Sequence, residues 1–199
     1  MAKQRRSSRR FVVLMACMAV AVAALPGRGW ALDLTAHTGV PLTLAAAQGD
    51  LQKVHQLIVA GTSPNLSDES GRPAIGWAAL EGHTAIIEEL LKAPRIQPNA
   101  TDAQGNTALI LAAQRGHADA VDALIRAKVN LNVDNRDGMT ALMLAAQNGF
   151  LQIVQELVKA GADTTIQDDT GRSALDWAQD NSRQDVVNFL QRASSSKKS

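Results

Sequence analysis

The sequence predicts an all-α solenoid of about five helix-turn-helix units that are joined by β-turn or hairpin loops. Residues 107–116 and 140–149 are nearly identical and lie 33 residues apart. Glycines that end such stretches recur at spacings of 33, 34 and 33 residues: Gly49, Gly82, Gly116 and Gly149. A fixed period of this length is typical of stacked units that bury their apolar faces only against their neighbours. Such a stack offers a long surface and no enclosed pocket, so binding is a more natural function for it than catalysis.

Each unit is expected to hold two helices separated by one of these glycines. Before the glycine, an apolar stretch carries paired alanines, such as Ala112-Ala113 and Ala145-Ala146, whose small side chains let neighbouring helices approach closely. After the glycine, aliphatic residues recur at helical spacing, as in Val121, Leu124 and Ile125. The glycine itself adopts a left-handed backbone at low cost, which suits the end of a helix.

A polar segment rich in Asp, Asn and Gly precedes most units and predicts a tight turn or short hairpin. The clearest examples are residues 68–71, 102–105, 135–138 and 168–171. Thr107 and Thr140 follow two of these segments, and we expect their hydroxyl groups to cap the next helix. The repeat domain is predicted to span residues 32–193, with units at about 38–67, 68–101, 102–134, 135–167 and 168–193.

The repeat closely resembles that of the ankyrin family, whose period of about 33 residues holds a β-turn, two helices and a Thr-Pro-Leu-His-x-Ala signature. Gly82-His83 and Gly116-His117 match the Gly-His pair between the family's helices, and residues 160–163 match its exit from the second helix. No unit has the full signature, because Ile110 and Met143 stand where the family has His. The resemblance implies a non-enzymatic module that binds other proteins.

Some residues depart from the repeat. Lys128 stands where Gly61 and Gly161 end their helices, so a left-handed backbone there would strain Lys128 by roughly 1–2 kcal/mol. In the last unit Ser182 replaces the glycine between the helices and polar residues follow it, as expected for a capping unit with a wettable outer face. Residues 194–199 are polar and are expected to form a disordered tail.

Residues 1–31 predict a secretory signal peptide. Basic residues precede an uncharged, mostly apolar run from Phe11 to Leu25, and Gly29-Trp30-Ala31 offers small residues at positions −3 and −1 of a cleavage site. The run is shorter than the roughly 20 residues of a spanning helix. We therefore expect a periplasmic or secreted bacterial protein. The alternatives are an uncleaved inner-membrane anchor that leaves the repeats facing the periplasm, the only case with membrane contact, and a eukaryotic secretory protein.

Removal of the signal would reverse the charge of the chain. The full sequence has a formal net charge of +1, but residues 1–31 hold six of its 20 Lys and Arg and none of its 19 Asp and Glu. The remainder carries a net charge of −5, which disfavours nucleic acid as a partner. The single cysteine, Cys17, leaves with the signal, so the mature protein forms no disulfide and is no thiol redox enzyme.

No residue pattern indicates a catalytic, cofactor or metal site. His83 and His117 recur with the repeat and His55 lies on the polar side of its helix, so the histidines supply no spaced zinc ligands. Glu88-Glu89 is interpreted as the solvated face of a second helix, and Asp168-Asp169 as turn residues that are favoured for their local hydrogen bonds. No phosphate loop, dinucleotide fingerprint or nucleophile elbow occurs. We therefore expect no cofactor, no metal and no enzymatic activity.

The resemblance to ankyrin proteins implies that a partner docks on the concave side, which the turn tips and the first helices form. By register, ten residues are assigned to that side: Arg72, Leu80, Gln104, Asn106, Arg115, Arg136, Asp137, Met139, Asn148 and Arg172. Leu80 and Met139 are expected to be exposed. Arg115, Arg136 and Met139 are the leading candidates, because Arg and Met are enriched in interfaces and these lie near the middle of the array. Trp77 and Trp177 fall at the repeat position of a leucine, so we expect them in the core rather than as ligand platforms.

The leading hypothesis is an exported, monomeric ankyrin-repeat protein that binds a periplasmic protein and scaffolds, protects or regulates it. One alternative is a secreted virulence factor that binds host proteins. Another is a small-ligand binder or enzyme with an unrecognised site.

Overall fold

The computed structural model describes residues 40–196, with side chains for residues 41–194. Three predicted segments therefore lie outside the described residues: the signal peptide at 1–31, the start of the repeat domain at 32–39, and residues 197–199 of the tail.

Ten α-helices follow one another along the described residues, and none of these residues forms a strand. The helices alternate between the first and the second helix of a unit. The first helices are α1 (Val40–Gln48), α3 (Ala74–Leu80), α5 (Ala108–Arg115), α7 (Ala141–Asn148) and α9 (Ala174–Asp180). The second helices are α2 (Leu51–Val59), α4 (Thr84–Lys92), α6 (Ala118–Arg126), α8 (Leu151–Lys159) and α10 (Gln184–Ser196).

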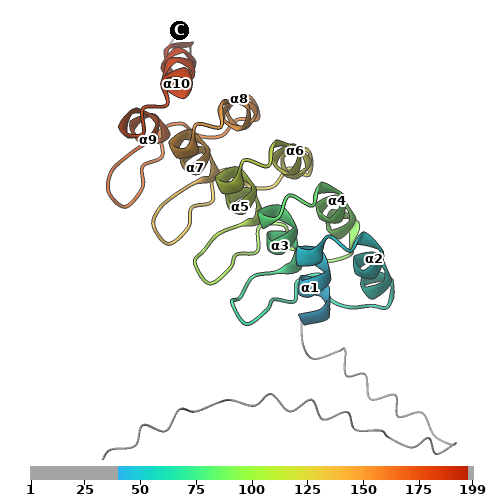
Figure 1. Cartoon of the computed structure of the whole chain (residues 1–199). Coiled ribbons are helices and arrows are strands. Elements are labelled where there is room, and N and C mark those ends of the chain that lie inside the picture. Colours follow the sequence, from blue (N-terminus) through green and yellow to red (C-terminus); the bar gives the residue numbers. More distant parts are fainter. Residues whose placement is uncertain (1–39, 197–199) are drawn as a thin grey trace, which may run out of the picture. The chain divides into compact units, whose positions relative to one another are not determined.

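The helices form two parallel rows, and the turn segments form a third (Figure 1). Each first helix packs against the first helices of adjacent units, and each second helix packs against its own first helix and the neighbouring second helices. Figure 1 shows the turn segments projecting from the row of first helices, away from the second helices. The predicted all-α solenoid of five two-helix units is therefore confirmed.

Local sequence signals explain where the helices begin and end. The hydroxyl oxygen of Thr107 accepts the backbone N–H of Ile110 at 3.3 Å, and that of Thr140 accepts the N–H of Met143 at the same distance, as predicted. The four glycines between paired helices have φ angles of 73° to 80°, in the left-handed region. Ser182 takes their place in the last unit and is also left-handed, with φ 56°.

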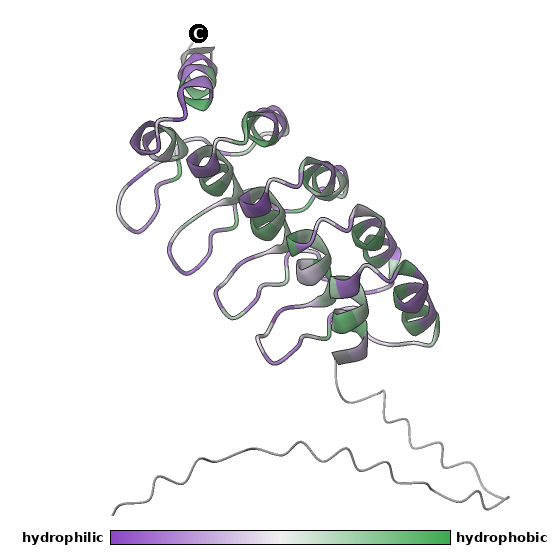
Figure 2. Cartoon of the chain, in the orientation of Figure 1, coloured by the Kyte–Doolittle hydropathy of each residue, from purple (hydrophilic) through white to green (hydrophobic). Residues whose placement is uncertain are grey.

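One hydrophobic core runs through all five units. The alanine pairs of α5 and α7 are fully buried, as are Leu124 of α6 and Val154 of α8. Short antiparallel bridges close three of the turn segments into hairpins, for example between Thr101 and Thr107. Figure 2 shows that the turn segments are largely hydrophilic and that most of the hydrophobic residues lie on the helices.

Three expectations about single segments are wrong. Helix α10 continues to Ser196, so residues 194–196 are helical rather than part of a disordered tail. Met139 is only 6% exposed and belongs to the hydrophobic core instead of projecting from its turn. Leu80 is half-buried and packs against the same core.

Candidate functional site

The turn segments form the surface that the sequence assigns to a partner. Each of the four described turns has five positions, and the turns span residues 68–72, 102–106, 135–139 and 168–172. Together with the exposed ends of the first helices, they make up what we call the turn face. In Figure 1 the turn segments lie side by side in one row along the stack.

An Asp or Asn at position 1 closes each turn. In the turn at 102–106, Asp102 Oδ1 accepts the backbone N–H of Gln104 at 3.0 Å and that of Asn106 at 2.9 Å. Asn135 Oδ1 makes the same two bonds, to Asp137 and Met139, both at 3.0 Å. Because one side-chain oxygen binds two backbone groups of its own turn, the loop is held in a single conformation.

Two turns add an arginine and a tryptophan to this arrangement. The indole Nε1 of Trp77 donates to Asp68 Oδ2 at 2.6 Å, and that of Trp177 donates to Asp168 Oδ2 at 2.8 Å. The guanidinium of Arg72 lies 4.6 Å from the Trp77 ring centroid, and that of Arg172 lies 3.7 Å from the Trp177 centroid, close enough for cation–π attraction.

Both tryptophans pack against the core, as expected, but they are half-buried and anchored to the turns by their indole nitrogens. This Asp-Arg-Trp cluster was not predicted. Its signal is a shared spacing: Asp, then Arg four residues later, then Trp five residues after that, in both the second and the fifth unit.

Hydrogen bonds favour the ionised form of the carboxylates at position 1 of the turns. Burial raises the pKa of Asp168, but bonds from the Thr170 hydroxyl, the Arg172 backbone N–H and the Trp177 indole outweigh it and lower the pKa to about 2. Burial also raises the pKa of Asp102, while bonds from Asn106 and from the Arg72 guanidinium bring it below its ordinary value.

Successive turns are joined to one another in a regular way. The carbonyl at position 3 of one turn accepts the N–H at position 2 of the next: Ala103 N to Ser70 O at 3.2 Å, Arg136 N to Gln104 O at 3.0 Å, and Asp169 N to Asp137 O at 3.4 Å. The turn face is therefore one hydrogen-bonded array rather than a set of independent loops.

The side chain at position 5 also reaches position 1 of the next turn. Arg72 donates to Asp102 Oδ2 from Nε at 3.3 Å and from Nη2 at 3.0 Å, and the Asp102 side chain is fully buried. One turn further on, Asn135 Nδ2 donates to Asn106 Oδ1 at 2.9 Å. Charged or polar side chains thus tie the second, third and fourth turns together.

The structure divides the ten predicted binding residues into three groups. Those with exposed side chains are Gln104, Arg115, Arg136 and Asp137. Those that are half-buried are Arg72, Leu80, Asn106, Asn148 and Arg172, and Met139 is buried.

Several of the half-buried residues already have partners within the fold. Arg72 and Asn106 join adjacent turns, and Asn148 Nδ2 donates to the Leu144 carbonyl at 2.9 Å. By contrast, the side chains of Arg115 and Arg136 make no hydrogen bond or ion pair with any described residue. These two cations are therefore free to meet a partner.

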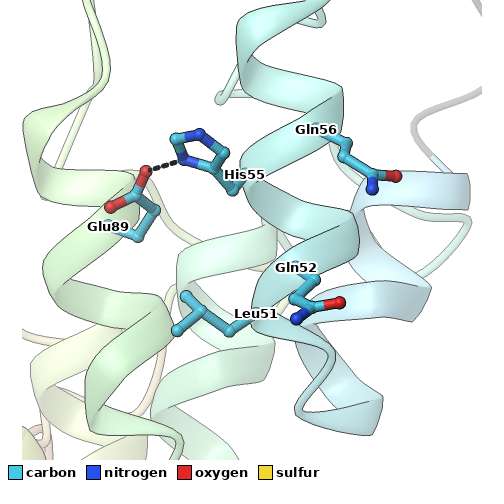
Figure 3. A pocket seen from close by; sticks show the side chains of 5 residues that line it. All are labelled: Leu51, Gln52, His55, Gln56 and Glu89. Carbon is cyan, nitrogen blue, oxygen red and sulfur yellow. Dashed lines mark hydrogen bonds and ion pairs between the residues drawn. The ribbon is translucent and has the colours of Figure 1, made fainter.

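Ion pairs link neighbouring second helices on the side of the stack away from the turn face. His55 Nδ1 lies 2.6 Å from Glu89 Oε1 across adjacent units, and Arg126 contacts both Glu88, at 3.2 Å, and Asp122, at 2.9 Å. Glu88 and Glu89 lie on the partly exposed face of α4, and each also pairs with a residue of a neighbouring unit. A shallow depression of about 360 Å³ lies beside the first pair (Figure 3), and its lining offers no further ionisable group.

The described residues contain no cluster of three or more His, Cys, Asp or Glu that could hold a metal ion. Among helices α1 to α10, none combines the length and the apolar character needed to span a membrane.

A stack of two-helix units with a hydrogen-bonded turn face defines a helical repeat protein. A family model described as ankyrin repeats (three copies) matches residues 42–134 and again residues 113–198. The chain belongs to the ankyrin-repeat family, whose members are typically non-enzymatic modules that bind other proteins. The comparison with curated proteins gave no match.

Proposed function

We propose that this chain is an exported, non-catalytic protein-binding module that acts in the periplasm. After removal of residues 1–31, the turn face would bind another protein and scaffold, protect or regulate it. The sequence of the N-terminal segment supports a periplasmic localisation, and membership of the ankyrin-repeat family supports a protein as the partner. Fold alone does not identify the partner, so the argument for where it binds rests on the turn face.

The observation that carries this proposal is the hydrogen-bonded array of turns. Three backbone bonds between turns and two side-chain links fix the loops before any partner arrives. A face that is already ordered loses little conformational entropy on binding, which favours affinity. Arg136 and Asp137 project from the middle of this array with opposite charges, which suits recognition of a specific, complementary protein surface.

The test is affinity capture from periplasmic extract with the wild-type protein and with a variant whose central charges are exchanged. Arg136→Glu combined with Asp137→Arg keeps the net charge and leaves the backbone bonds of the turn in place. We expect a captured protein to be lost from this variant and kept by Lys159→Glu, a control on the exposed side of α8. Equal capture by both variants would move the site away from the turn face.

The address is tested separately by cell fractionation and N-terminal sequencing. A periplasmic protein that begins at Leu32 supports the proposal. Recovery from the growth medium would favour a secreted protein, and recovery of the intact N-terminus in the membrane fraction would favour an anchor.

A further inference from the structure

In the fifth turn, the backbone carbonyl of Thr170 accepts no hydrogen bond from a described residue. Ser70, Gln104 and Asp137 each use their carbonyl to accept an N–H from the following turn. Thr170 occupies the same position in the fifth turn, and no described residue donates to its carbonyl. Among residues 40–196, no sixth turn packs against the fifth.

A cation stands beside that acceptor. Arg172 matches Arg72 in its turn position and in its stacking on a tryptophan. Arg72 places Nη2 against the carboxylate of Asp102, at position 1 of the next turn, and only 16% of its side chain is exposed. Arg172 is 37% exposed, and its Nη2 has no hydrogen-bond partner in the described part of the chain. Arg172 therefore lacks the carboxylate of a following turn that Arg72 binds within the chain.

The other contacts of Arg172 leave its Nη2 available to a ligand. Its Nε donates to the Thr170 hydroxyl at 2.8 Å, and Nη1 lies 3.4 Å from Asp180 Oδ2, which is half exposed. Such an exposed, long ion pair contributes little and is easily exchanged.

The glycines at position 4 show independently that the space beyond the fifth turn is open. A Cβ built on Gly138 would lie 2.7 Å from the backbone nitrogen of Asp169 in the next turn, and one on Gly105 would lie 3.1 Å from that of Arg136. A Cβ on Gly171 would meet nothing within 4 Å. The following turn covers this position elsewhere, whereas the fifth turn has a free side that we call the fifth-turn edge: Thr170, Gly171 and Arg172.

We propose that the fifth-turn edge binds an acidic segment of the partner protein, so this inference rests on the proposed function. A carboxylate of the segment binds Nη2 of Arg172, and the N–H of the next residue donates to the Thr170 carbonyl. The chain supplies the template, because Asp102 and Ala103 make these two contacts with Arg72 and Ser70. The adjacent N–H donor distinguishes an Asp-Xaa peptide from a phosphate group.

A second copy of the chain fits this edge poorly. Head-to-tail stacking would bring the first unit of the copy to the edge, and in the sequence residues 35–39 stand one repeat before residues 68–72. These residues, Thr-Ala-His-Thr-Gly, contain neither Asp nor Glu and offer no carboxylate to Arg172. The charge of the edge therefore favours a different, acidic protein.

The experiment uses the chain's own third turn as a probe. A cyclised synthetic peptide of residues 101–107 is titrated into the isotope-labelled protein, and chemical shifts are followed by NMR. We expect shifts confined to the fifth turn and the Trp177 indole N–H. A matched peptide with Asp102→Asn should bind roughly fivefold more weakly, because hydrogen bonds to charged groups are worth about 1 kcal/mol more than neutral ones.

Protein variants identify the residue. Arg172→Gln should abolish the shifts, and Arg172→Lys should weaken binding, because lysine lacks the planar group that stacks on Trp177. The thermal midpoint of each variant confirms that it is folded. Absence of shifts with the wild-type protein, equal binding of the two peptides, or unchanged shifts in Arg172→Gln would each overturn the inference.

Capture of the native partner separates the two proposals. If Arg172→Gln retains the partner that the wild type captures, the edge is not its site and the proposed function stands. If the wild type captures nothing, the proposed function fails even where the peptide binds. Concentration-dependent self-association that the peptide suppresses would make a second copy the occupant and overturn the choice of an acidic partner.

Discussion

Replacement of Lys128 by glycine should stabilise the protein. Lys128 follows α6 with φ 58°, at the place where Gly61 and Gly161 follow α2 and α8 with φ 89° and 98°. Its N–H donates to the Ile125 carbonyl at 2.9 Å, and the two glycines make the equivalent bond at 3.0 and 3.1 Å. The three sites therefore share one geometry, and only Lys128 reaches it with a side chain.

The size of the effect follows from two opposing contributions. A left-handed backbone costs an L-residue about 1–2 kcal/mol, while the greater freedom of glycine in the unfolded chain costs about 0.4–1 kcal/mol. The Lys128 side chain is exposed and pairs with no described residue, so its loss removes no contact. We expect a net gain of roughly 0.5–1 kcal/mol, which raises the thermal midpoint of a domain of this size by about 1–4 °C.

Thermal unfolding followed by circular dichroism measures this midpoint. Lys128→Ala is the control, because it removes the charge and keeps the strain, and its midpoint should stay near that of the wild type. The reciprocal change, Gly161→Lys, should lower the midpoint, since a Cβ there meets nothing within 4 Å and only the backbone is strained. A lower or unchanged midpoint for Lys128→Gly would refute the strain, as would a neutral Gly161→Lys.

Two further predictions concern the turns. Gly138→Ala and Gly171→Ala both place a side chain on a left-handed backbone, but only the first clashes with the following turn, so urea denaturation should show about 1–3 kcal/mol more destabilisation for Gly138→Ala. Equal losses would show that the turns do not pack as described. The folded-state pKa of Asp168, about 2, lies below its ordinary value of 3.8, so its contribution to stability is present above pH 4 and is lost as the pH falls toward 2. Asp168→Asn, which copies Asn135 of the preceding turn, should make the midpoint less dependent on pH in that range; an identical acid transition would contradict this assignment.

The fold could be predicted because its signals are local and repeated. The glycine spacing located four of the five helix pairs, and the threonine caps and the left-handed Lys128 followed from comparing equivalent positions. Contacts between units were harder to foresee, because the repeat shows which residues are equivalent but not which ones touch. Met139 was therefore expected at the surface although it is buried, and the pairing of Glu88 with Arg126 was not predicted.

The candidate site was predictable only in outline. The register placed Arg136 and Asp137 at a turn tip, where the structure has them exposed. It did not reveal that Arg72 is committed to Asp102 while Arg172 is not, because that difference depends on whether another turn follows. Equivalent residues in a repeat protein thus acquire different roles from their place in the series.

The one-dimensional stacking of the units also determines the order in which they unfold. Helices α9 and α10 pack mainly against each other and against the fourth unit, whereas α5 has a first helix packed on each side. In such a chain unfolding starts at a terminus and moves inward, so amide protons of the last unit exchange with solvent before those of the middle. A ligand bound to the fifth turn would stabilise the last unit against this unfolding. Its binding would therefore slow the hydrogen exchange of the amide protons in α9 and α10.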